Sequence, residues 1–272
     1  MNKISKYIAF LLLILTAVSC SDNDNWTIVT DVQPGIYISG DATVYSNEAP
    51  ASALRTVQLD GDVESYPEIV GIYTWLKGGS DFDISIVKEL NNSVKYGKGE
   101  ELVNTEAVQT YTLQEGGSSF SMNEDGLYHI VVNTALKEIN ILPVSLGVIG
   151  AATPDGWNGE TPLNAPEFNE SNLTATWTGN LNISPGEYKF RYSGDWGYYI
   201  NYDESTEVRL YTDLGSSGDD MAPLTEKSFS DIVPGAPNIT TEIGGEYKFT
   251  VKYEIRLRKF SATYEFIGDP IL

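Results

Sequence analysis

The chain has 272 residues, with 17 Lys and Arg against 38 Asp and Glu, and a formal net charge of −21. This charge argues against nucleic acid as a partner, because phosphate binding depends on basic side chains. A single Cys excludes a disulfide framework and a thiolate zinc site, and a single His excludes an imidazole-rich metal centre. We therefore expect no metal and no cofactor. The 17 Tyr and 25 Gly are typical of a turn-rich β protein with a proper core.

The N-terminus predicts export. Residues 1–19 combine Lys3 and Lys6 with an apolar run that is shorter than the about 20 residues of a membrane span, so they read as a secretory signal peptide. The sequence LTAVSC that ends at Cys20 resembles a bacterial lipobox, and this resemblance implies lipidation of Cys20. Several acyl chains on one Cys would anchor the protein stably. The alternative is a buried Cys in an ordinary signal sequence.

Residues 20–33 are expected to form a flexible tether. Its acidic start, SDND at 21–24, resembles the export signal that sends some Gram-negative lipoproteins to the outer face of the outer membrane. A body this acidic would be repelled by anionic headgroups. We therefore expect a protein at the cell exterior that touches the outer membrane through its lipid anchor only.

The mature chain reads as strand after strand. Short apolar or alternating runs are separated by Gly, Ser, Asp and Asn, which predicts an all-β protein of two tandem antiparallel β-sandwiches. We place the first sandwich at 34–144, as a spacer or a degenerate binding module, and the second at 145–272. The predicted strands are 35–40, 53–59, 72–76, 82–87, 128–132, 139–142, 146–149, 173–177, 188–192, 247–251 and 262–266.

A weak internal repeat supports two homologous modules. Chance agreement between β-rich segments is the alternative. The repeat also predicts that Trp75 and Trp177 occupy matching core positions and that His129 lies on the surface. The matched pairs are 35–43 with 146–153, 73–75 with 175–177, 81–85 with 187–191, and 126–132 with 245–251.

The strand at 188–192 alternates aromatic and basic side chains. A period of two puts Tyr188, Phe190 and Tyr192 on one face, expected to be core, and Lys189 and Arg191 on the other. The two basic side chains are well placed to donate hydrogen bonds to vicinal hydroxyls of a sugar. A merely solvated strand face is the alternative.

Two tryptophans stand in Gly-flanked loops, where a ring has few neighbours to bury it. These are Trp157 and Trp196, and Asp195, Tyr198 and Tyr199 crowd the second loop. Sugars offer C–H faces to flat rings and hydroxyls to polar groups, so this set suits a glycan-binding site. Burial of either Trp in the core is the alternative.

The second module resembles the repeated modules of the SusE/SusF family, which are starch-binding surface lipoproteins of glycan-utilisation systems. The resemblance rests on GAATPDGW at 150–157, GEYKFRY at 186–192 and DWG at 195–197, whereas the first module resembles the family only at GDAT (40–43) and around Phe82. It implies a platform of Trp157 and Trp196 edged by Lys189 and Arg191. It also implies a TonB-dependent transporter and its cap lipoprotein as partners, and no need for calcium.

Three other interpretations stay open. A structural or adhesive lipoprotein with immunoglobulin-like domains would dock onto a protein partner instead. An enzyme is disfavoured, because no nucleophile elbow, phosphate loop or metal-ligand cluster occurs. Carboxylate pairs such as Glu187 and Asp195 carry almost no information, because such pairs can always be found among 38 acids. The acidic loop 213–220 carries oxygen ligands that suit calcium but lacks the EF-hand spacing, which favours a flexible insertion.

Overall fold

The computed structural model describes residues 31–60, 66–192, 194–216 and 228–268. The predicted signal peptide, Cys20 and most of the tether therefore lie outside the described residues. The described part from Val32 onward forms one compact unit. It is all-β, as the sequence predicts, and is built from two curled antiparallel sheets, consistent with two tandem β-sandwich domains.

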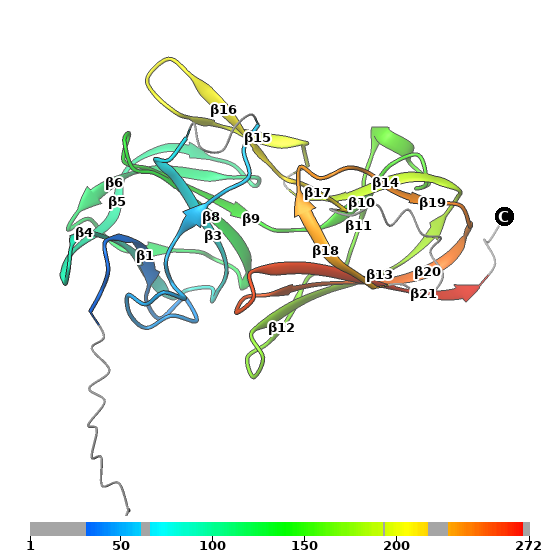
Figure 1. The fold of residues 1–272 in the computed structure, drawn as a ribbon, viewed down its shortest axis with the longest axis horizontal. Helices are drawn as coiled ribbons and strands as arrows, with labels where there is room; N and C mark the ends of the chain where they lie inside the picture. Colours follow the sequence, from blue (N-terminus) through cyan, green and yellow to red (C-terminus); the bar gives the residue numbers. More distant parts are fainter. Residues whose placement is uncertain (1–30, 61–65, 193, 217–227, 269–272) are drawn as a thin grey trace, which may run out of the picture. The chain divides into compact units, whose positions relative to one another are not determined.

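The first sheet uses the strands up to Pro143 (Figure 1, blue to green). Its order is β1-β4-β5-β6-β9-β8-β3-β2, with β7 paired to the start of β4. The strands are β1 (Gly35–Ser39), β2 (Arg55–Thr56), β3 (Ile69–Leu76), β4 (Asp81–Glu89), β5 (Asn92–Asn104), β6 (Gln109–Glu115), β7 (Phe120–Ser121), β8 (Gly126–Asn133) and β9 (Glu138–Pro143).

The second sheet begins at Gly147 and has the order β11-β10-β14-β17-β18-β21-β20-β13-β12, with β19 paired to β14. A hairpin of β15 (Gly197–Asn201) and β16 (Glu207–Tyr211) is inserted after β14. The other strands are β10 (Gly147–Ile149), β11 (Thr161–Pro162), β12 (Glu167–Asn169), β13 (Thr174–Ile183), β14 (Gly186–Arg191), β17 (Asp213–Ser216), β18 (Ser228–Pro234), β19 (Ile239–Thr241), β20 (Gly245–Glu254) and β21 (Lys259–Gly268).

The two sheets repeat one topology. Reading β1 as β10, β4 as β14, β8 as β20 and β9 as β21 turns the first strand order into the second, apart from the added edge strand β11. The register agrees, because Leu76 faces Gly126 in one sheet and Ile183 faces Gly245 in the other. By this register, Trp75 of the first module occupies the position that Asn182 occupies in the second. The predicted match of Trp75 with Trp177 is therefore wrong.

The repeated Gly-x-Ala-Thr segments form the same turn twice. Gly40 and Gly150 have φ of +139° and +149°, and a Cβ on either would fall within 2.5 Å of a backbone atom at the start of β4 or β14. In both turns the Thr side chain, Thr43 or Thr153, donates a hydrogen bond to the carbonyl of that Gly. Only glycine fits at this position, which explains why the motif recurs.

One hydrophobic core lies within the first sheet, and a larger one joins the second sheet to residues of the first, such as Leu127 and Val131. The side chains of Tyr188 and Phe190 in β14, and of Tyr192 directly after it, are fully buried, which confirms the predicted core face. Trp177 is fully buried as well, whereas Trp75 is half-buried and stacks on Phe168 of β12, with ring centroids 4.6 Å apart.

The outer face of β3 and β8 is covered by the second sheet, and the surface position predicted for His129 is therefore wrong. His129 is 2% exposed, stacks on Tyr73 at 3.9 Å and shares a hydrogen bond of 2.8 Å with the hydroxyl of Tyr192. The side chain of His129 points away from the core within the first sheet, as alternation along the strand predicts. The face on which it lies, however, packs against the second module. Burial lowers the pKa of His129 to about 3.

Two other segments differ from the prediction. The strand expected at 53–59 shrinks to the two residues of β2. Residues 213–216 of the predicted acidic insertion form strand β17, in which Asp213 is buried, while 217–220 lie outside the described residues.

Candidate functional site

Trp157 is presented to solvent by a short rigid turn. It lies in the 3-10 turn η2 (Gly156–Asn158), and 40% of its surface is exposed. The preceding loop is closed by the Gly150 N–H, which donates to the Gly156 carbonyl at 3.1 Å. Gly156 has a φ of +60°, a conformation that side-chain-bearing residues rarely adopt. The ring is thus held out by the backbone of the loop.

Trp196 is half-buried in the turn between β14 and β15. The Asp195 carboxylate accepts a hydrogen bond from the Trp196 N–H at 2.7 Å. Arg209 Nη2 donates to the Trp196 carbonyl at 2.9 Å, and Thr212 Oγ1 donates to the Asp195 carbonyl at 2.7 Å. The sequence analysis missed Arg209 and Thr212, because only the pairing of β15 with β16 brings them beside this turn.

The two predicted tryptophans come together. Their ring centroids lie 5.7 Å apart with an angle of 45° between the ring planes. The guanidinium of Arg191 lies 5.1 Å from the centroid of Trp196, which is within the range of a cation–π contact. We call Trp157, Trp196 and Arg191 the aromatic platform.

Arg191 is oriented by Glu160, a residue that the sequence analysis did not single out. Its Nε donates to Glu160 Oε2 at 2.6 Å, and the Arg191 side chain is only 12% exposed. Within the described part of the chain, the two Nη groups have no protein acceptor. They are thus available to donate to a ligand at the edge of the platform.

Lys189 is placed differently. Its ammonium forms an ion pair with Asp213 of β17, and the two side chains are 12% and 4% exposed. A lysine in this position neutralises a buried carboxylate, which is a structural role. A donor role for Lys189 toward a sugar remains a prediction, and this ion pair competes with it.

The two predicted tyrosines lie on opposite faces of β15. Tyr198 packs against the larger hydrophobic core, whereas Tyr199 is 59% exposed. Among the described residues, the ring of Tyr199 makes no contact with the ring of Trp157 or of Trp196. Tyr199 therefore extends the aromatic surface near the turn without belonging to the platform.

The two carboxylates named in the sequence analysis lie toward opposite ends of β14. Glu187 begins β14 and accepts from the Asn238 amide, whereas Asp195 follows the end of that strand. Four residues of strand alone span roughly 13 Å at about 3.3 Å per residue. Paired carboxyl groups in glycosidases lie about 5–9.5 Å apart.

The described residues contain no group of three or more His, Cys, Asp or Glu that could hold a metal ion. In the same part of the chain, no helix has the length and apolar character needed to cross a membrane.

Comparison with known proteins yields a distant structural similarity. No family model matches the chain, and no curated protein matches it. Among solved structures, SusF from Bacteroides thetaiotaomicron aligns with a TM-score of 0.30 and 15% identity, over 86% of this chain and 49% of that chain. The chain thus spans about half the length of that protein. A TM-score of this size carries no weight for function, so the proposal below depends on the residues of the chain itself.

Proposed function

We propose that this chain is a surface lipoprotein that holds a polysaccharide and does not react with it. The observation that carries the proposal is the aromatic platform, in which Trp157 and Trp196 lie 5.7 Å apart with Arg191 over the second ring. Trp157 is exposed although Trp is among the residues most favourable to bury, which favours a ligand for that ring.

The chemistry of the platform suits a saccharide. Indole rings offer flat apolar surface to the C–H groups of a pyranose ring, while the free Nη groups of Arg191 can donate to two neighbouring hydroxyls. Both loops are fixed by backbone hydrogen bonds, so little conformational entropy is lost when a ligand binds.

The setting of the platform follows from the sequence motifs. The resemblance to a lipobox supports lipidation at Cys20 and a tether over 20–33, with residues 145–272 as the binding module and 34–144 as a spacer. The resemblance to SusE/SusF modules supports a starch-like α-glucan as ligand, and a TonB-dependent transporter with its cap lipoprotein as neighbours in the outer membrane. One shallow site binds weakly, and repeated engagement along a polymer raises the effective concentration of ligand.

Affinity electrophoresis tests this proposal. The protein is run through native gels that contain starch, dextran, levan, xylan or mannan, and we expect at least one glycan to retard it. Trp157→Ala and Trp196→Ala should each abolish the retardation. The matched control is Phe266→Ala, which removes an aromatic ring that is 48% exposed and packs on Tyr247.

The other outcomes point elsewhere. Normal migration in every gel would overturn glycan binding and favour an adhesive protein with a protein partner. Release of reducing sugar from any of the glycans would instead indicate an enzyme.

A further inference from the structure

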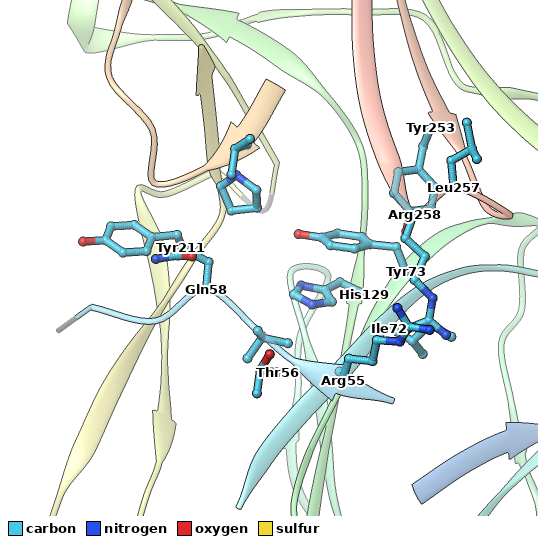
Figure 2. Close-up of a pocket in the computed structure, with 14 residues that line it drawn as sticks. Arg55, Thr56, Gln58, Ile72, Tyr73, His129, Tyr211, Tyr253, Leu257 and Arg258 are labelled. Carbon is cyan, nitrogen blue, oxygen red and sulfur yellow. The ribbon is translucent and has the colours of Figure 1, made fainter. Parts of the chain in front are cut away.

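A second candidate site lies in a cleft between the two sheets, well apart in sequence from the platform loops. The cleft has a volume of about 460 Å³, within the range of small-molecule sites. It is lined by β2, β3 and β8 of the first sheet, by β18, the end of β20 and the turn that follows β20 in the second sheet, and by the end of β16 in the inserted hairpin (Figure 2). Nothing in the sequence motifs pointed to it.

The charge of this cleft is opposite to that of the protein. Of the described residues that line it, none is Asp or Glu, although the chain carries 38 acids, and two are Arg55 and Arg258. Figure 2 shows both guanidinium groups at one end of the cleft. An arginine pair without a carboxylate is unexpected in a chain of net charge −21.

Neither arginine is neutralised by the described residues. Arg258 Nη2 donates to the carbonyls of Ala51 and Ala53, at 2.8 and 2.7 Å, which fixes the side chain but leaves its charge uncompensated. Arg55 is exposed, and its side chain has no ion-pair or hydrogen-bond partner in the described part of the chain. Burial, together with the charge of Arg55, lowers the pKa of Arg258.

The lining of the cleft also includes aromatic side chains. The ring of Tyr73 stacks on His129 and lies 5.3 Å from the ring of Tyr253. At the other end of the cleft, the hydroxyl of Tyr211 donates to Asp60 at 3.0 Å, and Gln58 lies beside it (Figure 2). Tyr253 is buried, whereas Tyr73 and Tyr211 are partly exposed, so these two rings and the paired guanidinium groups form a surface for a ring that carries an acid group.

We infer that this cleft binds an acidic saccharide, with the carboxylate or sulfate of the sugar held by Arg55 and Arg258 and the sugar ring against the tyrosines. Guanidinium groups match the geometry of carboxylate and sulfate oxygens and can bind them through two hydrogen bonds. The inference rests on the proposed glycan-binding function and adds a second, charge-selective site to it.

Isothermal titration of the purified protein tests the inference with four probes. These are trigalacturonate for a carboxylate, a sulfated chondroitin disaccharide for a sulfate ester, maltotriose as the neutral counterpart, and sodium sulfate as the free anion. Short probes are chosen because the net charge repels a long polyanion. We expect one acidic probe to bind at least tenfold more tightly than maltotriose and than free sulfate.

Matched variants locate the binding. Arg55→Gln removes an exposed charge that makes no structural contact, so it should lower the affinity for the acidic probe at least tenfold while the protein stays folded. Arg256→Gln is the control, because this exposed arginine lies on the same turn as Arg258 but outside the cleft. Loss of affinity in both variants would overturn the site and indicate a general charge effect.

Three further results would overturn the inference. They are no binding of either acidic probe, equal binding of maltotriose, and equal binding of free sulfate. The two proposals fail separately. Binding that is lost in Arg55→Gln and kept in Trp196→Ala supports the cleft whatever the neutral-glycan gels give, whereas binding that is lost in Trp196→Ala assigns the acidic probe to the platform.

Discussion

The guanidinium of Arg191 lies over the ring of Trp196, 5.1 Å from its centroid, and is held there from behind by Glu160. The contact joins a strand residue to a loop residue, so the rigid sheet sets the position of one and the turn sets the position of the other. The sheet and the turn therefore both hold the platform in place.

Removing the charge of Arg191 should weaken glycan binding more than it weakens the fold. We expect Arg191→Met to lower the affinity for the retained glycan about tenfold, since it removes two donors and a cation–π contact. The free energy of unfolding should fall by about 1 kcal/mol or less, because Glu160 remains 28% exposed to water. Titration calorimetry and urea unfolding check these values. The control variant Glu160→Gln keeps an acceptor for Arg191 Nε. A tenfold loss of glycan affinity in this variant would show that binding depends on the ion pair and not on the Arg191 donors.

Arg209 should act as a positioning residue for the Trp196 turn. Arg209→Met removes the hydrogen bond to the Trp196 carbonyl, and we expect the affinity for glycan to fall about three- to tenfold because the turn becomes less ordered. Arg209→Lys should recover part of the lost affinity, because a lysine can still donate to the Trp196 carbonyl. If Arg209 instead bound the ligand through both guanidinium nitrogens, lysine would not restore the affinity. The measurement is the same calorimetric titration, and unchanged affinity in Arg209→Met would contradict the positioning role.

The buried pair of Lys189 and Asp213 should matter for stability. Lys189→Met leaves the Asp213 carboxylate buried without its cation, and we expect the free energy of unfolding to fall by about 3–5 kcal/mol. Lys189→Met combined with Asp213→Leu should be considerably more stable than the single variant, because no charge stays buried. Urea denaturation measures both. A double variant as unstable as Lys189→Met would mean that packing, and not charge, causes the loss.

The stability of the protein should depend on pH through His129. Its pKa is about 3 in the folded protein because of burial, against an ordinary value of 6.5. Between these two pKa values the unfolded chain binds a proton at His129 that the folded chain does not bind. The neutral, buried His129 therefore costs no stability above about pH 6.5, and the free energy of unfolding decreases as the pH falls toward 3. The slope reaches about 1.4 kcal/mol per pH unit.

The variant His129→Gln isolates this effect, since it keeps a polar partner for the Tyr192 hydroxyl and does not titrate. We expect the free energy of unfolding of the wild type, relative to His129→Gln, to drop by about 2–3 kcal/mol between pH 7.5 and 4.5. The many surface carboxylates cancel in this comparison. Parallel pH profiles for the two proteins would contradict the buried, neutral His129.

The sequence predicted the fold class because period-two alternation and turn residues are local signals. It located β14 and its buried face from residues 188–192 alone. It missed β5 (Asn92–Asn104), whose polar and Gly-containing run shows no apolar alternation, and so it could not give the strand order. The same limit explains His129, because alternation gives the side of a strand and not what packs against that side.

The site was predictable in part for the same reason. Trp157 and Trp196 were found because Gly-flanked aromatics are visible in sequence, and the structure brings them together. Glu160, Arg209 and Thr212 act on those loops only through tertiary pairing, which no local pattern reports. The arginine pair in the cleft joins residues from opposite ends of the chain and was likewise invisible.

The central claim is that a saccharide lies on Trp157 and Trp196, and indole N–H signals in a two-dimensional ¹⁵N NMR titration test it most directly. On addition of the glycan that retards the protein, the account predicts shifts of the Trp157 and Trp196 signals, assigned by single Trp→Phe variants, and no shift of the buried Trp177. Saturating binding that leaves both platform signals unmoved would contradict it.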